Sequence, residues 1–329
     1  MTGSEVSAAG LAAMEIFEDL PAGQLAPLAE RLHALSAEAG QVLMREGERA
    51  ESFILIRSGA AEVRHVGEDG PPVTEVVGAG AIVGEIALLR DKPRSATVTA
   101  TEALSGYSGD AAAFAAMADL PGVGERLVRT ARQRLAAFIT PITVDFPEDT
   151  VLLLRPVLPG DSARSTHPAV DFSQETLYRR FMSTRAPTAA LMDYLFHVDY
   201  VDHFVWVLAA GENGPVVADA RYVRSDEDPA VAEVAFIVAD DYQGRGIGSF
   251  LMDALIVAAQ VGGVRRFTAR LLADNAPMRA ILDRFDGEWE HDEPGVVTTV
   301  FDVGEPERID AEMADRIRCM TRQVMRAVC

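Results

Sequence analysis

Two motifs along this chain combine residue types that bind phosphate-containing ligands. In the first, Gly84-Glu85-Ile86-Ala87 is followed by Arg94-Ser95, so a glycine, a carboxylate and a guanidinium occur at fixed offsets. A glycine lets the backbone approach a ligand, a carboxylate accepts a hydrogen bond from a sugar hydroxyl, and an arginine fork binds phosphate oxygens. This motif predicts a site for a small phosphate ester with a free hydroxyl.

The second motif begins at Gln243 and places glycines at 244, 246 and 248, between an apolar strand-like run and an apolar helix-like run. Glycines at the start of a helix expose backbone N–H groups at its positive end, which suits a pyrophosphate. A Walker loop does not fit, because Ser249 and Phe250 stand where it requires Lys and then Ser or Thr. A dinucleotide fingerprint fits poorly, because the preceding strand is not the first of its domain.

The composition favours a two-domain protein without a polyanionic partner. A chain of 329 residues has room for two domains with their own cores. Its net charge of −20 repels nucleic acid. No uninterrupted apolar run approaches about 18 residues and the N-terminus lacks signal-peptide features, so we expect a cytoplasmic protein with no membrane partner. Cys319 and Cys329, the only cysteines, give no metal-ligand spacing.

The spacing of apolar residues predicts an α+β protein of two domains. Residues 11 to 32 and 122 to 139 have helical spacing, and the short β-type runs between them are punctuated by glycines, which is typical of a β jelly roll. A segment with two prolines then predicts a linker, followed by mixed strands and helices and a final amphipathic helix. The predicted boundaries are 1–140 for a jelly roll with flanking helices, 141–150 for the linker, 151–303 for an α/β domain and 304–329 for the tail helix.

The first motif resembles the phosphate-binding cassette of cyclic-nucleotide-binding domains, and residues 11 to 140 resemble the whole domain. The resemblance implies that Glu85 holds the ribose, Arg94 holds the phosphate and Ser95 adds a hydrogen bond. We favour cAMP over cGMP, although the Ser95 hydroxyl would also serve guanine. The alternative is a degenerate jelly roll in which Arg94 merely pairs with Glu85. The predicted cAMP site is Gly84, Glu85, Ile86, Ala87, Arg94 and Ser95.

The second motif resembles the acetyl-CoA loop of the GNAT N-acetyltransferases, and residues 151 to 303 resemble their catalytic domain. The resemblance implies that the backbone of the strand ending at Val238 hydrogen-bonds the pantetheine of acetyl-CoA, as it would a neighbouring strand. It also implies that Asn275 contacts the pantetheine. Residues 173 to 182 resemble the substrate-side helix of members that acetylate protein lysines. The alternative is a structural glycine turn. The predicted acetyl-CoA site is Phe236, Ile237, Val238, Gln243, Gly244, Arg245, Gly246, Ile247, Gly248, Ser249 and Asn275.

Glu233 is the candidate general base. A lysine with a pKa near ~10.4 is only about one part in a few thousand neutral at pH 7, so its attack on a thioester is helped by a base. Several GNAT enzymes use a glutamate at this position, and the neighbours Val231, Val234 and Phe236 predict a carboxylate sheltered from water. The alternative is a solvent-facing strand residue. Many GNAT enzymes carry a general-acid tyrosine where this chain has Leu282, so we assign no general acid.

Three histidines are weaker candidates. His197 and His203 lie near acidic residues, but their spacing suits no single helical face and favours a structural role. His167 lies in a long loop, residues 156–172, on the substrate side of the predicted cleft. A neutral imidazole there would mimic the incoming amine near Glu233 and hold the enzyme inactive until the loop moves. A solvated loop histidine is the alternative.

The order of the two motifs resembles that of the mycobacterial cAMP-regulated protein lysine acetyltransferases, over nearly the whole chain. The resemblance implies transfer of an acetyl group from acetyl-CoA to a lysine ε-amine of a protein such as an acyl-CoA synthetase or a stress protein, with cAMP as allosteric effector. Two alternatives remain: an acetyltransferase for small amines, and a sensor that binds cAMP and acetyl-CoA without catalysis. Neither a metal nor a nucleic-acid or membrane partner is predicted.

Overall fold

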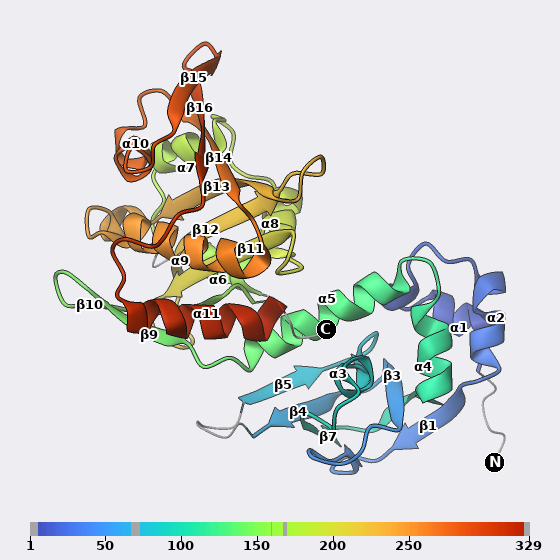
Figure 1. Cartoon of the computed structure of the whole chain (residues 1–329). Coiled ribbons are helices and arrows are strands. Elements are labelled where there is room, and N and C mark those ends of the chain that lie inside the picture. The colour runs from blue at the N-terminus through green and yellow to red at the C-terminus, as the bar shows by residue number, and fades with distance from the viewer. Residues whose placement is uncertain (1–5, 67–72, 159, 167–169, 326–329) are drawn as a thin grey trace. The chain divides into compact units, whose positions relative to one another are not determined.

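The computed structural model describes residues 6–66, 73–158, 160–166 and 170–325 (Figure 1). They form two compact units, divided between residues 138 and 139. None of the helices in these ranges combines the length and apolar character needed to span a membrane.

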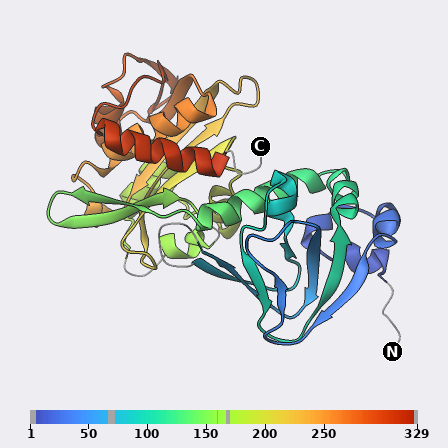
Figure 2. The same ribbon diagram turned by 60° about the horizontal axis from the view of Figure 1, so that its bottom comes forward.

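The first unit is a β-sandwich with helices before and after it (Figure 2). The predicted jelly roll with flanking helices is thereby confirmed. Its strands are β1 (His33–Ala37), β2 (Val42–Met44), β3 (Ser52–Ser58), β4 (Ala61–His65), β5 (Val73–Val77), β6 (Ile82–Val83), β7 (Thr97–Ala100) and β8 (Leu104–Asp110). They form two antiparallel sheets of order β1-β8-β3-β6 and β2-β7-β4-β5. The helices are α1 (Ala8–Ala12), α2 (Ala22–Ala29), α3 (Glu85–Arg90), α4 (Ala111–Ala118) and α5 (Val123–Ala137), with a 3-10 turn at Glu15–Phe17.

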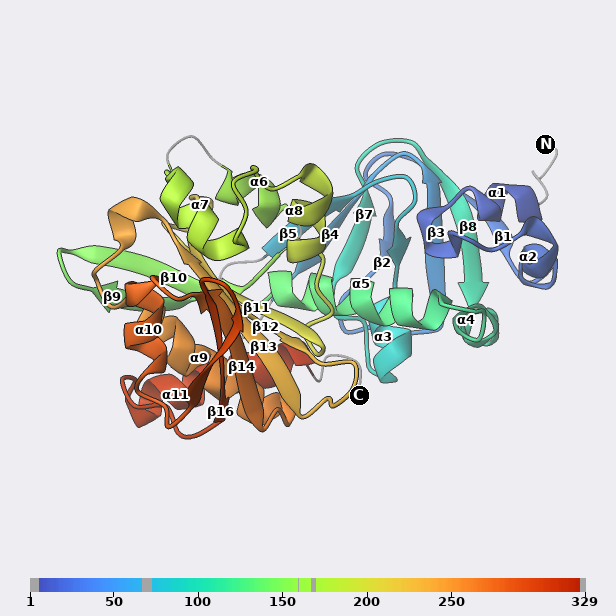
Figure 3. The same cartoon turned by 90° about the horizontal axis from the view of Figure 1, so that it is seen from above.

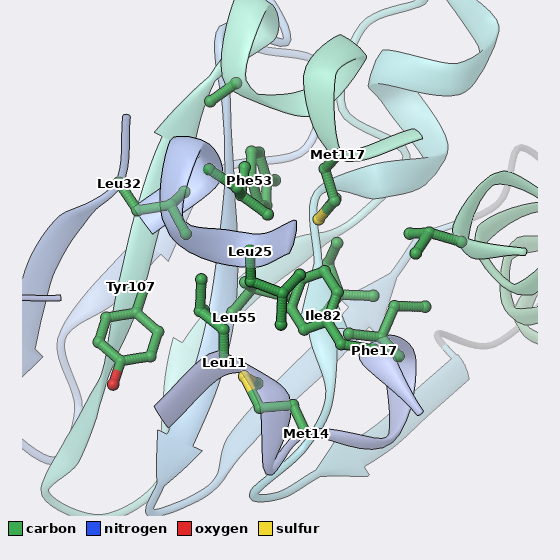
Figure 4. Packing of buried hydrophobic residues seen from close by; sticks show 14 of the residues in the cluster. Leu11, Met14, Phe17, Leu25, Leu32, Phe53, Leu55, Ile82, Tyr107 and Met117 are labelled. Atoms are coloured by element: carbon green, nitrogen blue, oxygen red, sulfur yellow. The ribbon is translucent and has the colours of Figure 1, made fainter. Parts of the chain in front are cut away.

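Strand β3 explains why this unit has a core on each side of one sheet. Its side chains alternate: Phe53 and Leu55 pack against the helices, whereas Ile54 and Ile56 pack against the second sheet. Figure 4 shows the helical side, where Phe53 and Leu55 meet side chains from the N-terminal helices and α4. A strand buried on both faces needs the continuous apolar run that Phe53–Ile56 provides.

The second unit is an eight-stranded sheet with helices on both faces, α9 and α11 on one and α6, α7 and α8 on the other (Figure 3). The helices are α6 (Asp161–Ser165), α7 (Gln174–Phe181), α8 (Ala189–Phe196), α9 (Ile247–Gly262), α10 (Ala276–Leu282) and α11 (Ala311–Met325), with a 3-10 turn at Asp240–Tyr242. The strands are β9 (Ile142–Phe146), β10 (Thr150–Pro156), β11 (His203–Ala209), β12 (Val216–Arg224), β13 (Val231–Val238), β14 (Arg266–Leu272), β15 (Glu288–Glu293) and β16 (Val296–Asp302), in the order β15-β16-β14-β13-β12-β11-β10-β9.

Only β13 and β14 run parallel in this sheet, and they soon part. Their ladder contains three pairs and ends at Glu233 and Thr268. Strand β13 stays paired with β12 as far as Val238. In this part of the described chain, the edge of β13 that faces β14 is therefore open beyond Glu233. An open edge within a sheet is a place where another extended chain can bind.

The predicted linker at 141–150 is wrong as a structural assignment. Residues 142–146 form β9, which pairs with β10 at the edge of the sheet. Ile142 and Val144 are buried and alternate with exposed Thr143 and Asp145. The prolines flank this strand rather than interrupt it, which is compatible with an edge position.

The C-terminal helix packs on α9. Helix α9 is apolar on nearly all sides because the sheet covers one face and α11 covers another. Asp253 in α9 is fully buried, and its Oδ2 accepts backbone N–H bonds from Glu307 at 3.0 Å and Arg308 at 2.5 Å. Its Oδ1 lies 3.3 Å from Arg284 Nη2. This carboxylate therefore holds the segment that leads into α11.

We expect Asp253→Ala to lower the free energy of unfolding of the second unit by about 3 kcal/mol, because a buried guanidinium and two N–H groups lose their acceptor. Both tryptophans, Trp206 and Trp289, lie in this unit, so urea unfolding followed by tryptophan fluorescence reports on it. The control is Asp315→Ala, which removes an exposed pair with Arg318 and should change stability by less than about 0.5 kcal/mol. Equal effects of the two substitutions on stability would contradict the conclusion that Asp253 holds the segment leading into α11.

Candidate functional site

The six residues of the predicted cAMP site lie together in the wall of one cavity of the first unit. The cavity measures only about 30 Å³, which is roughly the space of one water molecule. Arg134 and Phe138 also line it, although neither was predicted. The space left between these side chains is therefore smaller than a nucleotide.

Arg94 is buried, and among the described residues no carboxylate lies at ion-pair distance from it. Its Nη1 donates to the Gly84 carbonyl at 3.1 Å, and its Nη2 donates to the Ser52 carbonyl at 2.6 Å and to Ser52 Oγ at 3.2 Å. Burial lowers the pKa of Arg94 from its ordinary value, against the opposing effect of Glu85. Gly84 has a φ of +87°, and a Cβ there would lie 2.7 Å from Arg94 Nη1. Only glycine therefore fits at this position beside the guanidinium.

Glu85 pairs with Arg134 of helix α5, not with Arg94. Arg134 Nη1 donates to Glu85 Oε1 at 2.6 Å and also to the Ile82 carbonyl. Burial would lower the pKa of Arg134, but the carboxylates of Glu85 and Glu75 outweigh it and raise that pKa. The alternative of an Arg94–Glu85 pair is therefore wrong. The carboxylate expected to hold a ribose is engaged by Arg134, a residue too far along the chain for the motif to reveal.

The second predicted site forms one cavity of about 510 Å³ in the second unit. Its volume is within the usual range for cofactor sites. Arg245 is the exception among the predicted residues: its side chain points to Glu148, at 3.1 Å, and to Thr150 rather than lining the cavity. The predicted residues that do line it are Glu233, Phe236, Ile237, Val238, Gln243, Gly244, Gly246, Ile247, Gly248, Ser249 and Asn275.

The glycine loop places the N-terminus of α9 in this cavity. Gly244 and Gly246 have φ values of +76° and +84°, which favour glycine. A Cβ at Gly248 would lie 2.7 Å from Ile281 Cδ1, so this glycine allows α10 to approach α9. No side chain caps α9, and its first N–H groups lack intrahelical acceptors. The arrangement suits a pyrophosphate.

Asn275 caps the other helix at the cavity. Its Oδ1 accepts the Met278 N–H at 3.3 Å, and the residue is buried. The same side chain that begins α10 thus presents its amide group to the cavity. Leu282, which stands where many GNAT enzymes have a tyrosine, is buried in the core and offers no proton.

Glu233 lies at the point where β13 and β14 part, on the wall of the same cavity. Its expected shelter is wrong: the side chain is exposed. Val231 and Phe236 are only half-buried, so they do not enclose it. The carboxylate is accessible to an incoming amine, and two of the cavity's arginines, Arg180 and Arg270, are close enough to interact with it electrostatically.

Comparisons with known proteins agree with this geometry. The Cyclic nucleotide-binding domain family matches residues 34–119, and the Acetyltransferase (GNAT) family matches residues 173–286. Acetyltransferase Pat from Mycolicibacterium smegmatis is 55% identical over 327 residues, which cover 99% of this chain and 98% of that protein. This chain belongs to the Pat acetyltransferase family.

One similar solved structure covers nearly the whole chain, and one partial relative covers about a quarter of it. The cAMP-binding acyltransferase from Mycobacterium smegmatis is 52% identical, covers 98% of both chains and has a TM-score of 0.52. The cAMP-dependent protein kinase regulatory subunit of Yarrowia lipolytica is 42% identical over 85 residues, or 26% of this chain and 22% of that protein. As a Pat-family member, the chain is an acetyltransferase with an N-terminal cyclic nucleotide-binding domain and a C-terminal GNAT domain.

The described part of the loop predicted at 156–172 in this Pat-family chain contains the short helix α6. Asp161 at the start of α6 is fully buried and accepts two bonds from Arg155, at 2.6 and 2.8 Å. Ser173 donates to Asp240 from both its N–H and its hydroxyl group. His167, the candidate inhibitory residue, lies outside the described residues.

The segment that contains His197 and His203 is held by local hydrogen bonds. Asp199 Oδ1 accepts the N–H groups of Val201, Asp202 and His203 at 2.8 to 3.0 Å, which caps the turn before β11. His203 is buried, and its Nε2 has no hydrogen-bond partner. Within the described ranges, no group of three or more His, Cys, Asp or Glu side chains is placed to hold a metal ion.

We expect the stability of the second unit to fall as the pH drops from about 6.5 to 4. Burial, with a contribution from Arg221, lowers the pKa of His203 from 6.5 to about 4. In that interval the unfolded chain binds a proton at this position and the folded chain does not, so acid favours unfolding. Urea unfolding at several pH values should show a shallower pH dependence for His203→Phe. His291→Gln, an exposed histidine of the same unit, should keep the wild-type dependence. An unchanged slope in His203→Phe would contradict this account.

Proposed function

We propose that this protein transfers an acetyl group from acetyl-CoA to lysine ε-amines of protein substrates, and that cAMP bound in the first unit regulates the transfer. The observation that carries the proposal is the second cavity, in which Glu233, the open edge of β13 and the uncapped N-terminus of α9 share one wall. The M. smegmatis relatives, named an acetyltransferase and a cAMP-binding acyltransferase, support both parts.

The residues present fit acetyl-CoA. The N–H groups at the start of α9 would bind the pyrophosphate. The free edge of β13 beyond Glu233 would pair with the pantetheine amides, as an added strand pairs with a sheet edge. Asn275 would bind the same arm. Five residues of strand separate Glu233 from Val238, which is about 16 Å at ~3.3 Å per residue, so the phosphates and the thioester occupy opposite ends of the cavity.

The chemistry assigned to Glu233 is proton removal. The lysine nitrogen attacks the thioester carbon, its proton passes to Glu233 directly or through a water, and the carbon–sulfur bond breaks to release CoA thiolate. A backbone N–H of β13 would stabilise the oxyanion. An exposed carboxylate is reached easily by a long lysine side chain, and the absence of a hydroxyl at Leu282 leaves solvent to protonate the thiolate.

A protein substrate is favoured by the character of α7. This helix borders the cavity through Thr176, Arg179 and Arg180, yet none of its residues is fully buried. Tyr178 on the same helix is 41% exposed. A helix with an exposed aromatic side chain beside the reactive end is suited to contact a second protein, whereas a small amine would be better served by a closed pocket.

Regulation by cAMP requires that the nucleotide bind one arrangement of the protein more tightly than another. The Glu85–Arg134 pair provides that difference, because a ribose hydroxyl and Arg134 compete for one buried carboxylate. Arg134 belongs to α5, which is the last element of the first unit and continues directly into the chain of the second unit.

We expect Glu233→Gln to reduce acetyl transfer by about 100-fold or more, because the amide cannot accept the amine proton. The measurement is the incorporation of labelled acetyl groups into proteins of a cell extract, with and without cAMP. The affinity of Glu233→Gln for acetyl-CoA should equal that of the wild-type chain. Glu288→Gln makes the same charge change at an exposed position of β15 and serves as control. A non-catalytic sensor would show no difference between these variants, and a small-amine enzyme would label small molecules instead of proteins.

We expect Arg134→Gln to tighten cAMP binding by about tenfold, because Glu85 becomes available without breaking an ion pair. Arg94→Gln should weaken binding by about tenfold or more through loss of a charge-assisted bond to the phosphate. Calorimetric titration of the full chain measures both. Arg129→Gln, on the same helix but outside the cavity wall, is the matched control. Weaker binding in Arg134→Gln would show that Arg134 assists the ligand rather than competing with it.

A further inference from the structure

The wall of the second cavity is cationic in an acidic protein. The chain has 50 acidic and 30 basic residues, yet this wall contains four arginines and a single carboxylate, Glu233. Such segregation of charge favours anionic ligands locally even when the whole molecule repels them. The arginines are Arg179, Arg180, Arg270 and Arg308.

Two of these arginines at the reactive end already have anionic partners. Arg270 on β14 lies 2.6 Å from Asp292 and 3.2 Å from Glu293. Arg179 on α7 lies 2.5 Å from Glu175. Each of these two guanidinium groups therefore already has a carboxylate at ion-pair distance within the protein.

Arg180 differs from them. Its guanidinium carbon lies 5.1 Å from the centre of the Phe181 ring, and within the described residues no carboxylate lies at ion-pair distance from it. Asp219, an acidic residue that interacts electrostatically with it, is held by Arg221 at 2.7 and 3.1 Å. Burial and the charge of Arg221 lower the pKa of Arg180 to about 10. The cation is thus partly desolvated and lacks an anion, an arrangement that a negatively charged ligand would stabilise.

The position of Arg180 decides which anion that is. Helix α7 packs on β13, and Arg180 lines the same cavity as Glu233, so it belongs to the end of the cavity where the amine and the thioester meet. The pyrophosphate would bind at the start of α9, past the far end of β13, and that end of the strand lies about 16 Å from Glu233. An acetyl group carries no charge. The anion that reaches Arg180 must therefore enter with the lysine-bearing substrate.

We propose that Arg180 binds the carboxylate of an Asp or Glu side chain beside the acceptor lysine, so that the enzyme selects lysines with acidic neighbours. This inference rests on the proposed protein acetyltransferase function and names its substrate class. A planar guanidinium binds a carboxylate through two parallel hydrogen bonds, and the cation also disfavours lysines flanked by other basic residues. Arg180 is a specificity residue, whereas Glu233 is the base.

The test uses the full chain with cAMP and acetyl-CoA, and three peptides that are identical except that Asp, Asn or Arg flanks a single lysine. We expect kcat/KM to be about tenfold higher for the Asp peptide than for the Asn peptide, as one charge-assisted bond provides, and lowest for the Arg peptide. Arg180→Gln should bring the three values to within about twofold, while Arg180→Lys retains part of the preference. The KM for acetyl-CoA should not change.

Two further variants distinguish a specificity role of Arg180 from a structural role. Arg185→Gln removes the same charge from an exposed position outside the cavity and should leave the peptide preference intact. Arg180→Glu should reverse it in favour of the Arg peptide, which a merely structural role would not produce. A wild-type enzyme that acetylates the three peptides equally overturns the inference and leaves the proposed function standing.

An alternative source of the carboxylate is the acyl group itself. If Arg180→Gln selectively impairs transfer from malonyl-CoA while the peptide preference persists, the anion belongs to the acyl donor and the inference is overturned. If the wild-type chain transfers no acetyl group to any peptide or protein, the proposed function itself fails.

Discussion

The divergence of β13 from β14 is the constraint on which the catalytic unit depends. Backbone N–H and carbonyl groups inside a sheet need partners, and β13 loses those on its β14 side beyond Glu233. The glycines that begin α9, the Asn275 that begins α10 and the carboxylate of Glu233 all line the cavity associated with this opening. A sheet fully paired at this point would have neither an open edge nor a place where a base and an extended cofactor meet.

The first unit depends on a different constraint, which is the cost of burying charge. Arg94 and Glu85 are both buried, and each needs hydrogen bonds to remain charged there. The structure supplies them from carbonyl oxygens for Arg94 and from Arg134 for Glu85. Nucleotide binding at this site is therefore an exchange of partners, and its affinity is a difference between two sets of interactions. By linkage, whatever changes the position of Arg134 changes the affinity for the nucleotide, and nucleotide binding in turn changes the position of Arg134.

The parts of both sites that follow from local sequence were predictable. A glycine with positive φ at the start of a helix depends only on residues next to it in the sequence. The spacing of the motifs was therefore enough to locate Gly84, Gly244 and Gly246. Arg134 and Arg180 were not, because they reach their sites through packing of helices that lie far from the motifs in the chain. Similarly, two prolines suggested a linker where they flank an edge strand, because the pairing of β9 with β10 is a tertiary feature.

Glu233 illustrates the same limit in a single residue. The resemblance to GNAT enzymes placed it on the strand and in the cavity where the structure has it, but apolar sequence neighbours did not bury it. In a strand, the neighbours of a side chain in space come from adjacent strands and covering helices, and here they include Arg180 and Arg270. The electrostatic environment of the base is therefore set by α7 and β14 rather than by Val231, Val234 and Phe236.

The strongly negative net charge and the cationic cavity are compatible because they act over different distances. At physiological ionic strength, charges more than about 8 Å apart in solvent are largely screened, so the 20 excess negative charges influence approach more than contact. Inside the cavity, low-dielectric walls strengthen the interaction of each arginine with whatever enters. An acidic substrate is therefore mildly repelled at a distance and attracted at the cavity. A basic substrate is attracted at a distance and repelled at the cavity. Selection in such a protein must take place at the cavity, where Arg180, which has no carboxylate at ion-pair distance among the described residues, has more influence than the charge of the whole surface.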